Sequence, residues 1–205
     1  MRITEIDFND ANNPYLLPVN TSNRHLHLSQ EDLAALFGPG YQLTPIKDLT
    51  QPGQFACAET LQVAGPKGTI ELRILGPVRP QTQIELAQTD ARKIGVKAPI
   101  RESGHLEGTP GIVLIGPKGA IITEQGCIVA APHVHLHTSE GKALGLENGE
   151  KVDLYIQGEQ KAMVLQDVVV RVGDNCAMDI HLDTDEANAA RVPKDGKALL
   201  VKQEK

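Results

Sequence analysis

One short phrase recurs four times along this chain of 205 residues, and the repeat is the strongest constraint on its fold. LSQEDLAALFG follows His27, LAQTDARKIGV follows Glu85, LHTSEGKALGL follows His135, and LDTDEANAARV follows His181. Each copy places a leucine, an acidic residue and a small or apolar residue at the same three offsets. A turn containing Ser, Thr or Asp, with an acid close behind, is typical of a helix start, and three copies end at a glycine, as helices often do. The repeat therefore predicts four strand–turn–helix motifs, each with a His or Glu at the strand end.

Two of the copies follow a duplicated His-x-His phrase. His25 and His27 lie in NRHLHLS, and His133 and His135 lie in APHVHLH. Residues i and i+2 of a strand point to the same face, so each pair can clamp one metal ion of the kind that imidazole binds. A single pair could also be two solvated side chains, and the repeats could be a duplication that only packs a core. The recurrence of the surroundings, with His in three copies and Glu in the fourth, favours metal ligands.

The rest of the chain is typical of a mainly β protein. Short β-branched segments alternate with Gly and Pro, and aromatic residues make up only 3%, so the core must consist of Val, Ile, Leu and Ala. We predict two tandem β-barrel domains with short capping helices. The predicted divisions are a loosely ordered lead-in (1–17), a first barrel (18–128) and a second barrel (129–205), with the active centre between the barrels. The phrase GPKG occurs at 65–68 and 116–119 and predicts two hairpin tips; a phosphate-binding loop is the alternative.

Composition excludes several classes of function. The net charge of -6 argues against general nucleic-acid binding, which requires a basic surface. Three cysteines without C-x-x-C spacing indicate neither a disulfide framework nor a zinc knuckle, and favour a reducing compartment. No apolar run approaches the ~20 residues that span a bilayer, and the start of the chain lacks the features of a secretory signal. We therefore expect a cytoplasmic protein without membrane contact; the sequence leaves the oligomeric state open.

Several phrases together resemble a known family. They are SNRHLHLS (22–29), LTQPGQFA (49–56), LGPVRPQTQIEL (75–86) with TDAR (89–92), GTPGI (108–112), HVH (133–135) and HLDTDEANAA (181–190). In this order they closely resemble the phosphate propanoyltransferases, the PduL-type phosphotransacylases associated with propanediol-using bacterial microcompartments. That family has two tandem β-barrels and two zinc ions, and it exchanges an acyl group between coenzyme A and phosphate. The resemblance implies an acyltransferase that converts propanoyl-CoA or acetyl-CoA and inorganic phosphate into acyl phosphate and CoA. It leaves the lumen of a microcompartment open as a second location.

The resemblance also implies site residues. One zinc would be held by His25, His27 and Glu85, the other by His133, His135 and His181, and Arg79 would bind phosphate. Two divalent cations with one carboxylate leave a local charge of about +3, which attracts anions. Three protein ligands per zinc leave a coordination position open for a substrate. The chain departs from the family in having Pro132 where an arginine usually precedes the second His-x-His. His137 shares the strand face of His135 and is expected to be a supporting or solvated histidine rather than a seventh ligand.

Two other functions use part of the same pattern. His25, His27 and Glu85 alone match the two-histidine, one-carboxylate set of non-haem iron oxygenases, which would leave the second histidine cluster unexplained. A duplicated β-barrel module in which metals only brace the structure, without catalysis, is the other alternative.

Overall fold

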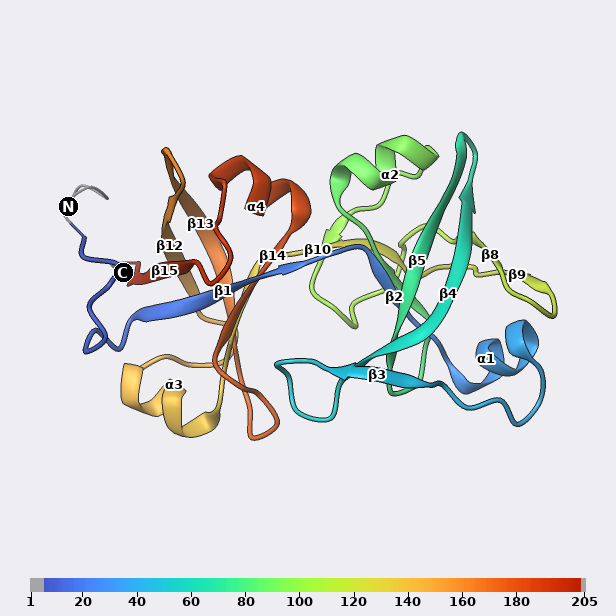
Figure 1. Ribbon diagram of the computed structural model, residues 1–205, viewed down its shortest axis with the longest axis horizontal. Coiled ribbons are helices and arrows are strands. Elements are labelled where there is room, and N and C mark those ends of the chain that lie inside the picture. Colours follow the sequence, from blue (N-terminus) through green and yellow to red (C-terminus); the bar gives the residue numbers. More distant parts are fainter. Residues whose placement is uncertain (1–5, 204–205) are drawn as a thin grey trace. The chain divides into compact units, whose positions relative to one another are not determined.

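The computed structural model describes residues 6–203, and its strands and helices form two compact units (Figure 1). Residues 23–130 form one, here the middle unit. Residues 6–22 and 131–203 form the other, here the terminal unit. Both consist mainly of strands with two short helices each, so the predicted mainly β class is confirmed.

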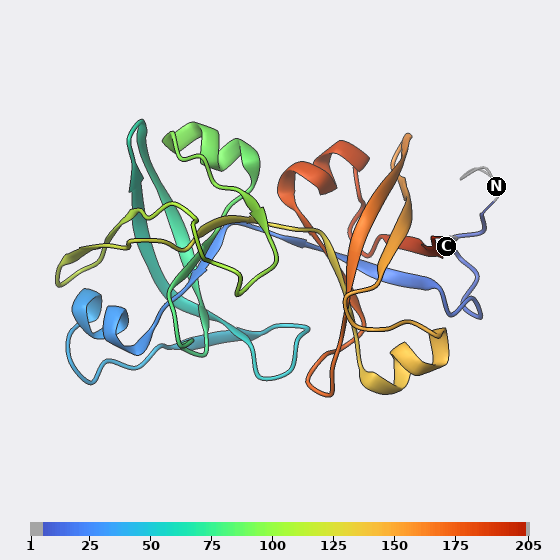
Figure 2. The same cartoon turned by 180° about the vertical axis from the view of Figure 1, so that it is seen from behind.

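The terminal unit is a closed barrel with the strand order β1–β14–β11–β13–β12–β15 (Figure 2). Its strands are β1 (Leu16–Ser22), β11 (His133–Leu136), β12 (Lys151–Gly158), β13 (Lys161–Val172), β14 (Asp179–Asp183) and β15 (Lys197–Lys202). Its helices are α3 (Thr138–Leu144) and α4 (Thr184–Ala190). The core is aliphatic, as the scarcity of aromatic residues requires; Val134, Val170 and Ile180 are fully buried on three adjacent strands.

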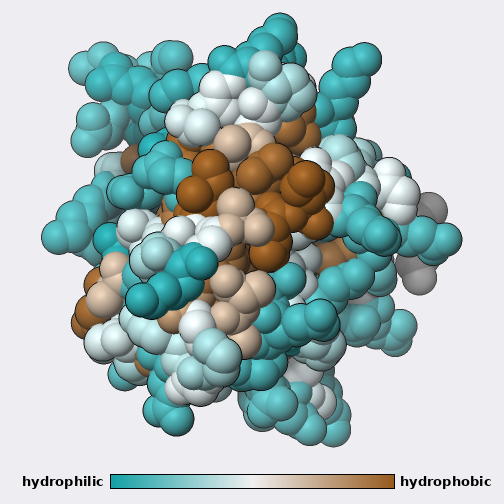
Figure 3. Space-filling model, turned by 90° about the vertical axis from the view of Figure 1, so that its right-hand side faces the viewer, coloured by the Kyte–Doolittle hydropathy of each residue, from teal (hydrophilic) through white to brown (hydrophobic). Residues whose placement is uncertain are grey.

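The middle unit is a curled sheet with the order β7–β10–β6–β2–β5–β4–β8–β9, and β3 pairs with β4. Its strands are β2 (His25–His27), β3 (Pro45–Asp48), β4 (Phe55–Gly65), β5 (Gly68–Gly76), β6 (Gln83–Glu85), β7 (Ile100–Arg101), β8 (Val113–Ile115), β9 (Ala120–Ile122) and β10 (Cys127–Ala130). Helix α1 (Gln30–Phe37) packs against β9, and α2 (Gln88–Ile94) packs against β5. Figure 3 shows an apolar area on one face of this unit, and the strands β8 and β9 carry the exposed Ile115 and Ile122.

All four predicted strand–turn–helix motifs are present, as β2–α1, β6–α2, β11–α3 and β14–α4. Ser29 caps α1, and Asp183 forms a capping box with Glu186 at the start of α4. The second copy differs, because Ala87 precedes α2 and offers no side-chain acceptor. His137 is the N-cap of α3: its ring accepts a hydrogen bond from the Ser139 amide, which gives this histidine a structural role.

The strand that precedes each His-x-His pair in the chain belongs to the other unit, not to the unit that contains the pair. β1 precedes β2 in the chain but pairs with β14 and β15 of the terminal unit. β10 precedes β11 but pairs with β6 and β7 of the middle unit. Residues 16–22 therefore belong with the terminal unit and residues 129–130 with the middle unit, which differs from the predicted divisions 1–17, 18–128 and 129–205. Residues 1–5 of the predicted lead-in lie outside the described residues, and residues 6–15 carry turns.

Both GPKG phrases form hairpin tips, as predicted. Gly65 pairs with Gly68 between β4 and β5, and the Gly116 amide donates to the Gly119 carbonyl between β8 and β9. Gly65 also lies against α2, where an added Cβ would stand 2.4 Å from the Ile94 carbonyl oxygen. Within residues 6–203, no helix is both long and apolar enough to cross a membrane.

Candidate metal centres

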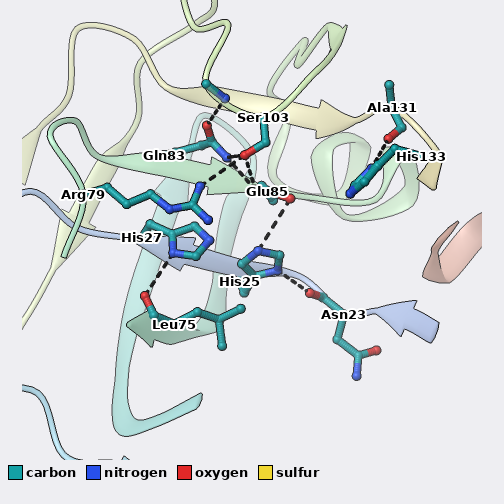
Figure 4. Close-up of polar contacts among 11 residues, drawn as sticks. Asn23, His25, His27, Leu75, Arg79, Gln83, Glu85, Ser103, Ala131 and His133 are labelled. Atoms are coloured by element: carbon teal, nitrogen blue, oxygen red, sulfur yellow. Dashed lines mark hydrogen bonds and ion pairs between the residues drawn. The ribbon is translucent and has the colours of Figure 1, made fainter. Parts of the chain in front are cut away.

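The first candidate centre consists of His25, His27 and Glu85 and is assembled by strand register in the middle unit. Strand β2 runs antiparallel to β6, with His25 opposite Glu85 and His27 opposite Gln83. Leu26 points the other way and is fully buried in the core, so both imidazoles share the face of Glu85. One candidate ligand atom from each of the three side chains lies within 4.8 Å of the others. The structure therefore brings together the three residues that the sequence singled out (Figure 4).

Backbone carbonyls fix the tautomers of both histidines in the first centre. Nδ1 of His25 lies 2.8 Å from the Asn23 carbonyl oxygen, and Nδ1 of His27 lies 3.0 Å from that of Leu75. A carbonyl oxygen can only accept, so each Nδ1 carries the proton and donates it. In the neutral ring, the lone pair is then on Nε2, the arrangement usual for metal-bound histidines.

The protonation states in the first centre are set by burial and by the pairing of His25 with Glu85. Burial lowers the pKa of His27 to about 3, helped by the charges of His25 and Arg79. Burial also lowers the pKa of His25, but the charge of Glu85 and a hydrogen bond to it outweigh this, and the net pKa is raised. Burial alone would raise the pKa of Glu85, yet the charge of His25 and their hydrogen bond hold it well below its usual range. The site thus pairs an ionised Glu85 carboxylate with a His25 ring whose protonated form is favoured, and Nε2 of His25 lies 3.5 Å from Oε2 of Glu85.

A polar network joins Arg79 to the first centre. The Gln83 amide nitrogen donates to Oε1 of Glu85 and to Oγ of Ser103, and the Gln83 oxygen accepts from the Gly104 amide at 2.8 Å. Arg79 donates from Nη1 to the same Ser103 hydroxyl at 3.1 Å. The predicted phosphate-binding arginine therefore lies beside the predicted ligands, connected to them through Ser103 and Gln83 (Figure 4).

The second candidate centre consists of His133, His135 and His181 in the terminal unit and repeats this register. His133 on β11 lies opposite His181 on β14, and His135 lies opposite Asp179. The three rings are mutual neighbours, with centroids 4.7 to 5.1 Å apart. Their candidate ligand atoms also lie within 4.8 Å of one another.

The polar partners of the second centre hold its rings in place. Nδ1 of His133 contacts the Ala131 carbonyl oxygen at 2.8 Å (Figure 4). Nε2 of His181 lies 2.8 Å from Oδ2 of Asp179, which also accepts from the Asn20 amide at 2.8 Å. Within residues 6–203, Nδ1 of His135 and Oδ1 of Asp179 are buried without any hydrogen-bond partner. An unpartnered buried polar atom is unfavourable, and a bound cation would satisfy the nitrogen.

In the second centre, the surroundings of His133 and His135 favour the neutral form of both rings. Burial lowers the pKa of His133 to about 3, together with the charge of Arg171. Burial lowers the pKa of His135 to about 4, together with the charges of His181 and Arg171. Arg171 lies on β13 in parallel register with His135. Three neutral imidazoles are a set of ligands that catalytic zinc uses in proteins, as are two imidazoles with a carboxylate. Both sets of side chains therefore fit a divalent metal ion such as zinc.

Sequence reasoning missed four residues around these centres, namely Gln83, Ser103, Arg171 and Asp179. Two of them carried a signal, because Gln83 and Asp179 stand two residues before the third ligand of their centre and so share its strand face. Ser103 and Arg171 reach the centres through loop folding and strand pairing, which the sequence does not reveal. Pro132 supplies no cation before His133, and its carbonyl accepts a backbone hydrogen bond from Val169.

Comparison with known proteins identifies the family. A model of the phosphate propanoyltransferase family matches residues 18–193. A phosphate propanoyltransferase of Thermotoga maritima is 50% identical over 173 residues, covering 84% of this chain and 82% of the relative. Relatives with the same description in Rhodopseudomonas palustris and Rhodobacter capsulatus are 42% and 44% identical, covering 93% and 89% of this chain and 84% and 85% of theirs. The chain therefore belongs to the phosphate propanoyltransferase family and is an acyltransferase.

Proposed function

We propose that this enzyme interconverts propanoyl-CoA and inorganic phosphate with propanoyl phosphate and CoA, with one zinc ion at each candidate centre. The observation that carries the zinc proposal is the pair of matched ligand sets, each assembled by the same strand register and each with backbone or side-chain partners that fix its donor atoms. The family and the descriptions of its relatives support the substrates. We include acetyl-CoA as a second substrate, because one methylene changes discrimination by only about 1 to 3 kcal/mol.

His25, His27 and Glu85 would hold one zinc ion, and His133, His135 and His181 the other. When bound, zinc would supply a Lewis acid for an acyl or phosphate oxygen and an acceptor for the thiolate sulfur of CoA. Arg79 provides what a metal does not, namely a planar pair of donors that matches two phosphate oxygens. Its hydrogen bond to Ser103 holds the guanidinium beside the first centre, where bound phosphate is positioned for reaction.

Direct attack by phosphate fits the state of the cysteines. Burial raises the pKa of Cys57 to about 11 and that of Cys127 to about 12, and burial also raises the pKa of Cys176. These thiols are therefore protonated near neutral pH and are poor nucleophiles.

In the proposed reaction, a phosphate oxygen forms a bond to the thioester carbonyl carbon, the carbon–sulfur bond breaks, and CoA departs as the thiolate. Membership of an acyltransferase family removes the support for the oxygenase and for the non-catalytic module.

The test is release of free thiol from propanoyl-CoA by protein of measured metal content. We expect thiol release only when phosphate is present, and about two zinc ions per chain. Removal of the metal by a chelator should abolish activity, and added zinc should restore the activity. Arsenate, acetyl-CoA and butanoyl-CoA serve as parallel substrates that define the specificity. Release without phosphate would contradict phosphotransacylation, and full activity in metal-free protein would contradict the zinc centres.

A further inference from the structure

Strands β6 and β14 carry a second polar residue on the same face as the third ligand of each centre. Gln83 precedes Glu85 by two residues, and Asp179 precedes His181 by two residues. Each lies opposite the second histidine of its His-x-His pair: Gln83 opposite His27, and Asp179 opposite His135. Both are almost completely buried, with exposed fractions of 2% and 0%. Buried polar side chains are costly unless their hydrogen bonds are made, so their partners reveal their role.

In each centre, this second polar residue forms a hydrogen bond with the third ligand. The hydrogen bond occupies one atom of that ligand and leaves another atom free to bind a metal ion. Gln83 donates to Oε1 of Glu85, and the other oxygen, Oε2, is the one that lies 3.5 Å from Nε2 of His25. Asp179 lies 2.8 Å from Nε2 of His181, so that nitrogen donates to the carboxylate and Nδ1 keeps the lone pair.

Other contacts anchor each of these residues from behind. Gln83 is held by Ser103 and by the Gly104 amide, and Asp179 is held by the Asn20 amide. Neither side chain can therefore turn away from its ligand without breaking further hydrogen bonds that are partly shielded from solvent.

We propose that Gln83 and Asp179 are the positioning residues of the two centres, each holding the third ligand so that one chosen atom faces the metal. This rests on the proposed binding of zinc at these centres. The two copies of the repeat support it, because the ligand and its partner change together. A carboxylate ligand has an amide donor beside it, whereas an imidazole ligand has a carboxylate acceptor beside it.

Gln83 and Asp179 could not replace one another, because each matches the hydrogen-bonding chemistry of its own ligand. An aspartate in place of Gln83 would set a second carboxylate against Glu85 and provide no donor. A glutamine in place of Asp179 would be one methylene longer and would lack the negative charge that strengthens the hydrogen bonds from Asn20 and His181. A side chain that only filled space would not require this match between the chemistry of the partner and that of the ligand.

The test is a titration of metal-free protein with zinc in the presence of a competing chelator. We expect two binding events in the wild type. Gln83→Met keeps the volume and removes the donor, and should weaken one event about 10- to 100-fold. Asp179→Asn should weaken the other event by a similar factor, because the amide lacks the negative charge of the carboxylate whose Oδ2 accepts from both Asn20 and His181. Matched controls are Gln62→Met and Asp167→Asn, at exposed positions of the same units, and both should bind as the wild type does.

Two further measurements separate positioning from a general structural defect. Thermal unfolding of the metal-free variants reports folding, and the visible absorption of Co²⁺-loaded protein reports ligand geometry at the metal. Positioning predicts altered cobalt bands in variants whose metal-free form still unfolds cooperatively. Unchanged affinity and unchanged cobalt bands in both variants would overturn this inference and leave the proposed function intact. A wild type that binds no zinc would instead overturn the proposed centres themselves.

Discussion

His25 on β2 lies directly opposite Glu85 on β6, with Nε2 3.5 Å from Oε2. In the other unit, His133 and His181 occupy the same positions on β11 and β14. A single antiparallel register thus places the third ligand across from the first histidine in both centres. The apolar residue between the two histidines, Leu26 or Val134, is fully buried and fixes which face the imidazoles occupy. In β2 and in β11, the same His-x-His tripeptide therefore provides two metal ligands and one residue of the core.

Replacing Glu85 by Gln should remove zinc from the first centre alone. The side chain keeps its shape but loses the charge, and an amide is a poor zinc ligand compared with a carboxylate. Zinc content measured by elemental analysis should fall from about two to about one per chain, and kcat should fall at least about 100-fold. Glu71→Gln, at an exposed position on β5, is the matched control and should retain both ions. Two zinc ions in the Glu85 variant would show that this carboxylate is not a ligand.

Replacing Arg79 by Lys should weaken phosphate binding without loss of metal. Lysine keeps the positive charge but cannot make two parallel hydrogen bonds to a phosphate, and it would not reproduce the contact with Ser103. The KM for phosphate should rise about 10- to 100-fold, which corresponds to losing one charge-assisted hydrogen bond, while the KM for propanoyl-CoA changes less. Arg191→Lys, at an exposed arginine of the terminal unit, controls for the substitution itself. A KM for phosphate equal to that of the wild type would remove Arg79 from the phosphate site.

The centres could be predicted from the sequence because their ligands follow local rules. The spacing of His25 and His27 puts both rings on one strand face, and the recurring phrase marks Glu85 and His181 as equivalent positions. The starts of α1, α3 and α4 and both hairpin tips are likewise determined by nearby residues. These features depend on backbone geometry over only a few positions.

The partners of strands could not be predicted in the same way. Strand β1 begins at Leu16, inside the predicted lead-in, and its buried Val19 pairs with Ile180 far along the chain. The placement of Arg171 beside His135 likewise depends on the pairing of β13 with β11. Side-chain alternation determines which face of a strand is buried and leaves the choice of neighbouring strand to the packing of the whole unit.

Replacing His137 by Ala should lower stability without changing the metal content. The ring caps α3 by accepting from the Ser139 amide, and loss of an N-cap costs about 0.5 to 2 kcal/mol. Chemical denaturation of the metal-free protein measures this loss, and His137→Asn should recover most of it because Asn is a good N-cap. Loss of one zinc ion from the Ala variant would instead identify His137 as a ligand.

Glu186 gives the terminal unit a pH-dependent stability. Burial raises the pKa of its carboxyl to about 7; the hydrogen bond from the Asp183 amide opposes this, and the charges of Asp183 and Asp185 reinforce it. An unfolded glutamate has a pKa of about 4.3. Between these two values the folded state binds more protons than the unfolded state, so this group makes the free energy of unfolding fall as the pH rises from about 4.3 to about 7.

Glu186→Gln should therefore be more stable than the wild type at pH 8 and similar to it near pH 4.5. Glutamine keeps an acceptor for the Asp183 amide, so the capping box at the start of α4 persists while the buried charge is removed. We expect a gain of about 1 to 2 kcal/mol at pH 8, reduced from the full linkage value because the carboxyl is partly exposed to solvent. Denaturation of the metal-free proteins at several pH values measures the difference in the free energy of unfolding between variant and wild type. Effects of pH that are common to both proteins cancel in this difference. Glu159→Gln, at an exposed position of the same unit, controls for the change in net charge. A difference that did not grow with pH would show that Glu186 is already ionised in the folded protein at low pH.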